Sequence, residues 1–253
     1  MPLMTIDNYE GSADVYTFTY NPQIYETTLD SNHNIVEVPF DKKHILISGE
    51  GISPRMFILS GHTSGTNRFS DFRGLAKHIG QTTKLKKLFF ENDKFAIVVG
   101  KQCKQVNTGE RTMFIDYVAS FVSPIGLLFK STQATTGTNG GNASTFVEEI
   151  TCVVNVTGVD ITMTDGTNSF KIDGAALTAG DVIVMKLITM ITSGNGIYTS
   201  EYRNVTINGT KTRRVTTTAG TGIITLAAGA NISTVTLTNA ITIVKTFRDA
   251  WFM

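Results

Sequence analysis

The sequence predicts a mainly β protein with two domains: an N-terminal β-barrel or split-barrel domain with one helix, and a C-terminal β-sandwich. Three observations lead to this prediction. Apolar residues and Thr alternate through much of the second half, as in 201–210 and 241–247, which is the pattern of half-buried antiparallel strands. Only one segment has apolar residues at helical spacing. The composition also changes near residue 131, where charged residues and Phe give way to Thr.

The N-terminal part is predicted to hold several strands and a single helix. Strands are expected at 15–20, 44–48, 55–60, 88–90, 95–99 and 112–121, the last two joined by a turn at 107–110. The helix begins near Ser70, which can cap it, and ends near Gly80. Its apolar face consists of Phe69, Phe72, Leu75, Ala76 and Ile79. Strands on both sides of one helix predict a small β-barrel or a half-open sheet that the helix covers on one side.

The segment 131–145 contains neither a charge nor a large apolar side chain. It cannot bury enough surface to offset the entropy lost on ordering, which favours a flexible linker or a long loop. The domain boundary is therefore placed there. The expected division is an N-terminal domain at 1–130, a linker at 131–145 and a C-terminal domain at 146–253.

The C-terminal part is predicted to be almost purely strands. They are expected at 146–155, 160–164, 169–172, 181–192, 198–207, 212–217, 223–226, 232–237 and 241–247. Asp165-Gly166 and Asn208-Gly209 lie between alternating runs and are the strongest hairpin turns. About nine short strands at this spacing predict a β-sandwich.

The charge balance argues against a protein that coats nucleic acid. The chain has 22 basic and 21 acidic side chains and a formal charge of +1, whereas such proteins are strongly basic. Lys84, Lys86 and Lys87, and the pair Arg213-Arg214, are expected to be solvated surface. Cys103 and Cys152, the only cysteines, fit a reduced protein better than a disulfide scaffold.

No segment of the chain predicts a targeting signal or a membrane span. The N-terminal residues have no basic region followed by an apolar stretch, so no signal peptide is expected. Residues 215–244 are uncharged but contain nine Thr and alternate in polarity. A spanning helix is therefore not predicted there, and no membrane insertion is expected.

The motifs that resemble catalytic or cofactor sites are all incomplete. Residues 49–54 lack the third Gly and the following helix of a dinucleotide fingerprint. In 61–65 the serine, Ser64, comes one place too late for a nucleophile elbow, so a loop leading into the helix is expected. Glu148 and Glu149 are adjacent in a strand and point to opposite faces. We predict no catalytic or cofactor-binding residue, no cofactor and no enzyme.

The histidines and the terminal aromatic residues also favour structural roles. The four histidines, at positions 33, 44, 62 and 78, have no metal-ligand spacing, and no metal-binding residue is predicted. Trp251, with Phe247 and Phe252 beside it, favours a core anchor that closes the last strand over an aromatic that stacks on a ligand. No residue of a binding site can be named from the sequence.

Two groups of segments carry a resemblance to a known family. Residues 52–61, the helix at 68–79 and the hairpin that ends at 114–126 are similar to the N-terminal belt domain of the phage distal tail proteins, which form a ring at the tip of long bacteriophage tails. Residues 177–184, 205–210, 226–232 and 247–251 are similar in order to its galectin-like C-terminal domain. The opening forty residues lack a clear counterpart to the family's first strands.

This resemblance implies a structural protein of the virion tail tip, made in the host cytoplasm. It implies a homohexameric ring that joins the tail-tube protein on one side to the tail hub protein on the other, with receptor-binding or side-fibre proteins attached around it. DNA would pass through the bore without specific binding. A ring of this kind can close through a heterologous interface, and subunits joined through sheet edges leave no strand backbone unpaired.

Two other functions remain open on the sequence alone. A tail-tube or tail-terminator protein also uses a β-barrel with a helix, and the hairpin at 95–121 could stack one ring on another. A carbohydrate-binding host-attachment module would need an exposed aromatic side chain flanked by polar groups. In the C-terminal part, Tyr198, Tyr202 and Trp251 are the candidates for that role.

Overall fold

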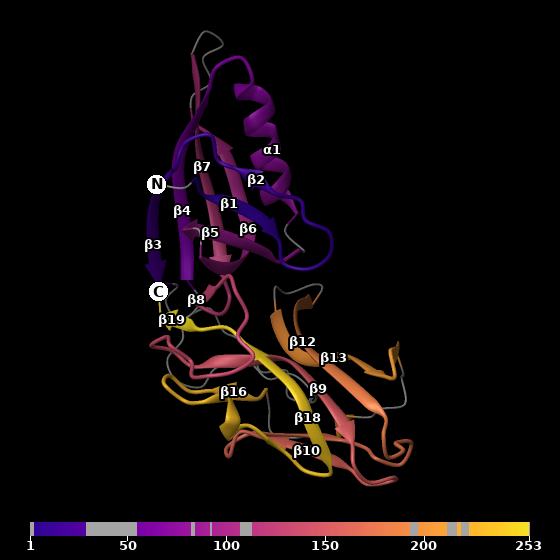
Figure 1. Cartoon of the computed structure of the whole chain (residues 1–253). Helices are drawn as coiled ribbons and strands as arrows, with labels where there is room; N and C mark the ends of the chain where they lie inside the picture. Colours follow the sequence, from indigo (N-terminus) through magenta and orange to yellow (C-terminus); the bar gives the residue numbers. More distant parts are fainter. Residues whose placement is uncertain are drawn as a thin grey trace.

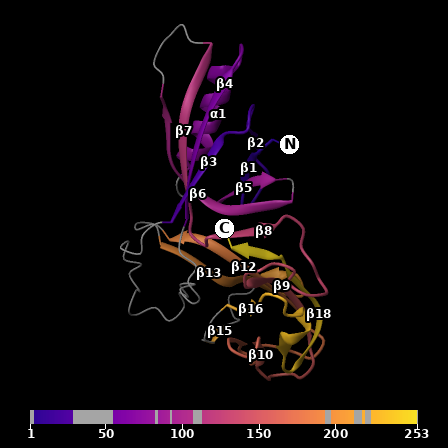
Figure 2. The same ribbon diagram turned by 90° about the vertical axis from the view of Figure 1, so that its left-hand side faces the viewer.

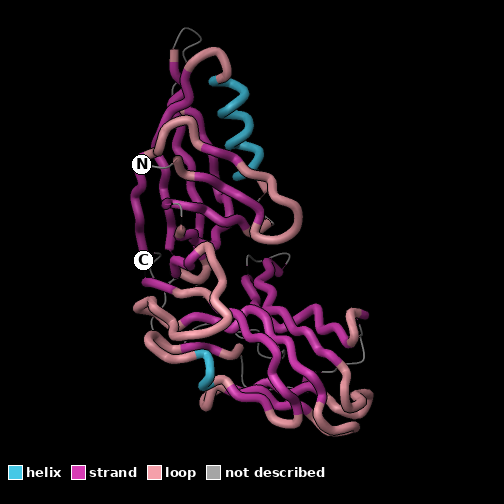
Figure 3. Tube along the Cα trace, viewed as in Figure 1, coloured by secondary structure: helices cyan, strands magenta, loops and turns pink. Residues whose placement is uncertain are grey.

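A computed structural model describes residues 3–28, 55–81, 84–91, 93–106, 113–192, 197–211, 217–218 and 223–252. The chain is mainly β, as the sequence predicts, and its strands form two halves that lie end to end (Figure 1). Colouring by secondary structure shows α1 (Arg68–Gly80) beside the strands of the N-terminal half (Figure 3).

The N-terminal half is built on one open sheet in which β6 (Lys94–Gln105) is central. Its strands run in the order β2-β1-β5-β6-β7-β4-β3, and β8 and β19 (Ala250–Phe252) are attached beside β6. The other bounds are β1 Thr5–Asn8, β2 Tyr16–Thr17, β3 Gln23–Thr28, β4 Arg55–Ser64, β5 Lys86–Glu91, β7 Phe114–Ser123 and β8 Leu127–Lys130. Of the two forms expected, barrel or half-open sheet, the described residues adopt the open one.

The sheet bends at β6 into two layers. The first residues of β6 pair with β5 and β8, whereas its last residues pair with β7. We call β2-β1-β5-β6-β8-β19 the first layer and β6-β7-β4-β3 the second layer. Between them lies a core to which the first layer contributes Ile6 and Leu88, the second Leu59 and Phe121, and α1 Leu75. The helix therefore covers one face of the second layer, as predicted.

The helix begins two residues earlier than the sequence predicts. Asn67 precedes it without making a side-chain cap hydrogen bond, and Ser70 lies inside the first turn. Phe69 was expected on the apolar face but is exposed, with the Arg68 guanidinium carbon 4.8 Å from its ring centroid. Ile79 is buried and packs so close to β6 that a Cβ on Gly100 would lie 2.3 Å from its carbonyl oxygen.

The first layer is buried on both of its faces. Ala96 and Val98 face the core shared with α1, and Phe95 and Ile97 face a second cluster on the other side. That cluster also contains Phe146 and Ala250 from the C-terminal half, so the two halves share apolar packing. Alternate residues of a strand point to opposite faces, and the unbroken buried run of β6 follows from this position between two cores.

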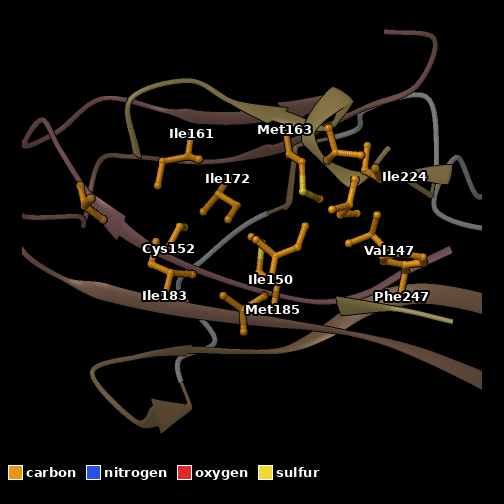
Figure 4. Packing of buried hydrophobic residues seen from close by; sticks show 14 of the residues in the cluster. Val147, Ile150, Cys152, Ile161, Met163, Ile172, Ile183, Met185, Ile224 and Phe247 are labelled. Atoms are coloured by element: carbon orange, nitrogen blue, oxygen red, sulfur yellow. The ribbon is translucent and has the colours of Figure 1, made fainter. Parts of the chain in front are cut away.

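The C-terminal half is a β-sandwich, as the sequence predicts. One sheet has the order β15-β11-β10-β17, and the other has the order β14-β13-β12-β9, with β16 and β18 both paired to β9. The bounds are β9 Thr145–Val154, β10 Ile161–Thr164, β11 Ser169–Ile172, β12 Val182–Thr192, β13 Ile197–Ile207, β14 Thr210–Lys211, β15 Thr217–Thr218, β16 Thr225–Leu226, β17 Thr236–Leu237 and β18 Ala240–Phe247. Ile150, Met163, Ile183 and Phe247 interdigitate between the sheets (Figure 4).

Both hairpin turns expected from the sequence are present. Asn208 and Gly209 have φ angles of 49° and 78° and connect β13 to β14, which is the turn type that matches the twist of the strands. The Asp165 carboxylate accepts hydrogen bonds from the amides of Thr167 and Asn168 at 2.8 and 2.6 Å, and this fixes the turn between β10 and β11.

Several short elements differ from the prediction. β1, β3, β8 and β19 were not predicted, because they are short or rich in polar residues. In 232–237 the expected strand is interrupted by a 3-10 turn at Ile232–Thr234. The strand expected at 44–48 and the turn at 107–110 lie outside the described residues.

The segment 131–145 is a long loop, one of the two forms expected from the sequence, and it is bonded to other segments. It bridges to Phe247 through Ala134 and to Asn231 through Thr138. Asn139 is buried, and its side-chain amide donates hydrogen bonds to the carbonyls of Ala143 and Leu226 at 2.8 and 3.2 Å. Polar bonds to neighbouring backbone hold the loop in place where apolar groups are lacking. The division into domains stays a prediction.

Candidate assembly surface

The second layer of the N-terminal half has an outer face that points away from α1. Strand alternation places Ile58 and His62 of β4 on this face, because their neighbours Phe57 and Leu59 face the core. The register then places Tyr25 of β3 beside Ile58. Figure 2 shows the molecule from the side of β3 and β4. We define the outer face by Tyr20, Tyr25, Met56, Ile58, His62, Lys104, Val106, Phe114, Asp116 and Val118.

Aromatic rings gather at one end of the outer face. The His62 ring lies 4.9 Å from the Tyr20 ring and 5.3 Å from the Phe114 ring, centroid to centroid. The Ser64 hydroxyl donates a 3.0 Å hydrogen bond to the Tyr20 hydroxyl. The exposed fractions of Tyr20, Tyr25 and Phe114 are 48%, 55% and 46%. Since an aromatic residue buries about 150–250 Å² in a core, these three leave on the order of 300 Å² of surface for a partner.

The loop between β1 and β2 lies on the other side of the N-terminal half. In Figure 1 it reaches the right-hand side of the view, whereas β3 and β4 lie on the left. Asp7 shapes this loop, because one of its carboxylate oxygens accepts the amides of Asn8 and Asp14 at 2.7 and 3.0 Å. Glu10 and Val15 are exposed on it. The loop thus presents acidic and apolar groups from a fixed base.

A buried lysine supports the base of this loop. Lys86 is fully buried, and its ammonium donates hydrogen bonds to the side-chain oxygens of Asn8 and Gln81, both at 2.7 Å. Burial lowers the pKa of Lys86, whereas Asp14 raises it. The expectation that Lys86 is solvated surface is therefore wrong. Strand alternation turns it inward, and the two amide oxygens replace its water.

The two lysines beside Lys86 differ from it and from each other. Lys84 is exposed, as expected. Lys87 is half-buried, and its ammonium lies 5.7 Å from the Tyr9 ring centroid and 5.6 Å from that of Phe95. Burial lowers the pKa of Lys87. Arg213 and Arg214 lie outside the described residues.

His78 lies on the last turn of α1, next to the same loop. It is buried, and its Nε2 is 3.7 Å from an Asp14 carboxylate oxygen. Its Nδ1 has no hydrogen-bond partner among the described residues. Burial lowers the pKa of His78, the Lys86 charge lowers it further and Asp14 raises it. His62, in contrast, lies on the outer face of β4. His33 and His44 lie outside the described part.

The other residues considered from the sequence do not come together as a reactive site. Ser64 ends β4, so 61–64 is strand and not loop. Glu148 bonds Arg248 at 3.0 Å and Glu149 bonds Lys186 at 3.1 Å. In the residues that the structure describes, no group of His, Cys, Asp and Glu could hold a metal ion. Residues 49–54 lie outside the described part.

The cysteines are free thiols and the terminal aromatic residues have separate environments. Burial raises the pKa of Cys103 and of Cys152 to about 11. Phe247 is a core residue, whereas Phe252 is exposed. Trp251 is half-buried, with the Lys94 ammonium 4.7 Å from its ring centroid. The side chains of Tyr198 and Tyr202, the other candidates for a sugar site, are outside the described part.

The outer face was not anticipated from the sequence. Met56, Phe57, Ile58 and Leu59 are all apolar, so alternation cannot tell the inner from the outer phase of β4. Apolar residues at both alternating positions were the available signal for a second buried face, because a strand with one solvated face should alternate apolar with polar residues. No helix in the described residues is long and apolar enough to span a membrane.

Comparisons with known proteins give distant structural likenesses and no sequence match. No family model matches the chain, and no curated protein sequence matches it. The crystal structure of SPP1 Dit (gp 19.1), described as a paradigm of the hub adsorption apparatus in phages that infect Gram-positive bacteria, is similar with a TM-score of 0.42 and 12% identity. The match covers 98% of this chain and 99% of that chain.

Proposed function

We propose that this chain is a structural protein of a bacteriophage virion and forms a ring at the distal end of a long tail. In this role it connects the tail-tube protein to the tail hub and the host-adsorption apparatus. The order of segments that resembles distal tail proteins supports the family. The observation that carries the assembly role is the outer face of the second layer, where three aromatic side chains remain about half exposed. Large apolar side chains exposed on one face of a sheet are typical of an interaction site.

The open sheet supports a ring in a second way. In the described residues β2 and β3 end the strand order, so each has an unpaired edge. Free edges invite pairing with another chain, and a heterologous contact that closes under rotation forms a ring. Six copies are proposed from the family resemblance. The formal charge of +1 suits a bore through which DNA passes without specific binding, and the role proposed is not enzymatic.

Measuring the mass and symmetry of the purified full chain tests this function. We expect particles of six times the 27.5 kDa chain mass in native mass spectrometry, and closed rings in negative-stain images. Added tail-tube protein should bind one side of the ring, and hub protein the other. A chain that stays monomeric at high concentration and enters no particle with its viral neighbours would refute the proposal.

A tail-tube or tail-terminator protein is the second candidate. The observation in its favour is the hairpin of β6 and β7, whose strands have 12 and 10 residues and which projects at the end of the molecule away from the C-terminal half (Figure 1). A projecting hairpin can reach a neighbouring ring. The same images separate the two roles, because a tube protein gives stacked tubes and a tail-tip protein gives single rings.

A further inference from the structure

We propose that the outer face of the second layer binds a second copy of this chain, and that the partner copy contributes its β1–β2 loop. This inference rests on the proposed ring and names the surfaces that would close it. The outer face supplies the aromatic residues Tyr25 and Phe114, and the loop supplies Val15 and Glu10.

A second copy fits this face because a ring needs two different surfaces on each subunit. If the outer face met itself, the contact would be two-fold and would give a closed dimer. A ring of more than two copies joins a surface on one side of the subunit to a different surface on the other side. Strands β3 and β4, which form one edge of the outer face, and the β1–β2 loop lie at opposite edges of the N-terminal half (Figure 1), so copies placed side by side would bring these edges together.

The two surfaces are complementary in chemistry. Lys104 of β6 is in register with Val118 and is exposed on the outer face, which also carries the exposed Asp116 of β7. The contact proposed for the acidic loop is with Lys104. The loop carries Glu10 and Asp14 and no basic residue. An apolar centre with opposite charges at its rim is the usual composition of a specific interface. The Asp7 and Lys86 hydrogen bonds hold the loop in shape before contact, which reduces the entropy lost on assembly.

The size of the face also fits a protein partner. Its three aromatic rings leave about 300 Å² exposed, and Val106 adds to this because 58% of its surface is exposed. A standard interface covers about 800 Å² on each partner. The aromatic and aliphatic side chains of the face would therefore form the buried centre of the contact, and Lys104 and Asp116 its rim.

The first test removes the apolar centre. In the Tyr25→Ser, Phe114→Ser double variant we expect the concentration needed for ring formation to rise at least tenfold, measured by mass photometry over a dilution series. The matched control is Val156→Ser, Val159→Ser, which removes two exposed apolar side chains from the C-terminal half. We expect that control to assemble as the unchanged chain does. Thermal unfolding of the dilute monomers would show that each variant folds.

The second test identifies the partner surface by charge reversal. Lys104→Glu and Glu10→Lys should each weaken assembly about threefold to tenfold at low salt, and the two together should recover part of the loss. Additive losses would overturn the assignment of the β1–β2 loop. Rings that form normally in the aromatic double variant would overturn the whole contact while leaving the ring function standing. An unchanged chain that never assembles would instead refute the ring function itself.

Discussion

The two halves of the molecule bury and expose apolar surface differently. The C-terminal sandwich packs most of its large apolar side chains, such as Ile150 and Phe247, in one core between two sheets, and leaves Ile241 and Ile243 of β18 exposed. The N-terminal half packs apolar residues on both faces of its first layer and still leaves aromatic rings on the outer face of the second. The side chains that the sandwich leaves exposed are mostly aliphatic, whereas those on the outer face include the aromatic rings that we propose as a contact for a further partner.

The junction between the halves qualifies this contrast. The cluster around Phe129, Phe146 and Ala250 belongs to both halves, and β19 returns from the sandwich to pair with β8. Two crossings of the chain, one through 131–145 and one through 247–252, therefore run side by side. We infer that the halves unfold together although their surfaces differ.

The largest expected effect comes from removing a core aromatic in either half. Phe121→Ala and Phe247→Ala each delete a fully buried ring and should cost about 3–5 kcal/mol of unfolding free energy. Because the halves share the junction, both variants should lower the midpoint of one common transition in calorimetry. Trp251, the only tryptophan, lies at the junction and reports the same event by fluorescence. Two transitions, each shifted by only one variant, would show that the halves are independent.

The next effect comes from the junction itself and has a control one residue away. A Cβ on Gly141 would lie 1.7 Å from the carbonyl oxygen of Ala250, whereas one on Gly140 would lie 3.5 Å from an Asp249 oxygen. Gly141→Ala must displace the backbone of β19, at a cost of about 2–3 kcal/mol. Gly140→Ala should be close to neutral. Urea unfolding curves would measure both, and equal midpoints for the two variants would contradict this account of the junction.

The two glutamates of β9 give a smaller, paired comparison. Arg248 bonds Glu148 and also donates to the carbonyl oxygens of Lys130 and Ser131, in a setting where its side chain is 15% exposed. Arg248→Ala should therefore cost about 1.5–3 kcal/mol. Lys186 bonds Glu149 but its side chain is 53% exposed, so Lys186→Ala should cost under about 0.5 kcal/mol. Equal losses of unfolding free energy for the two variants would show that the Arg248 contact at the junction stabilises the chain no more than the exposed Lys186 contact does.

The sequence predicts the sandwich well because its signals are local. Alternating strands and Asn-Gly or Asp-Gly turns lie within a few residues of each other, as at Asn208 and Asp165. The N-terminal half depends on contacts between distant segments. Nothing near Lys86 in the sequence shows that the Asn8 side chain will accept a hydrogen bond from its ammonium. A strand of three residues such as β19 has no recognisable pattern before its partner β8 is known.

The loop at 131–145 and the outer face both show where prediction from local sequence fails. The loop lacks large apolar groups, which predicts mobility, but Asn139 makes the buried hydrogen bonds that hold the loop in place. The run from Met56 to Leu59 predicts a strand correctly, but which phase faces the core depends on where α1 packs. Local composition determines which elements form, and non-local packing determines which surface is left for a partner.

The smallest effect expected is an acid sensitivity that comes from the buried His78. The pKa of His78 is lowered in the folded chain, so the unfolded chain binds a proton more readily. Stability from this site is then complete above the unfolded value near 6.5 and is lost as the pH falls through the folded pKa. The charges of Asp14, Asp7, Lys77 and Lys86 also act on His78. Because Asp14 of the β1–β2 loop lies 3.7 Å from His78, the loss of stability should be greatest around this loop.

The comparison uses His78→Gln with His62→Gln as the matched control. Unfolding free energy measured from pH 7.5 to pH 5 should fall more steeply for the unchanged chain and for His62→Gln than for His78→Gln, because only the last lacks the buried imidazole. Hydrogen exchange of residues 9–15 should follow the same order. If all three slopes agree, the acid sensitivity of this half arises elsewhere and the buried histidine does not set it.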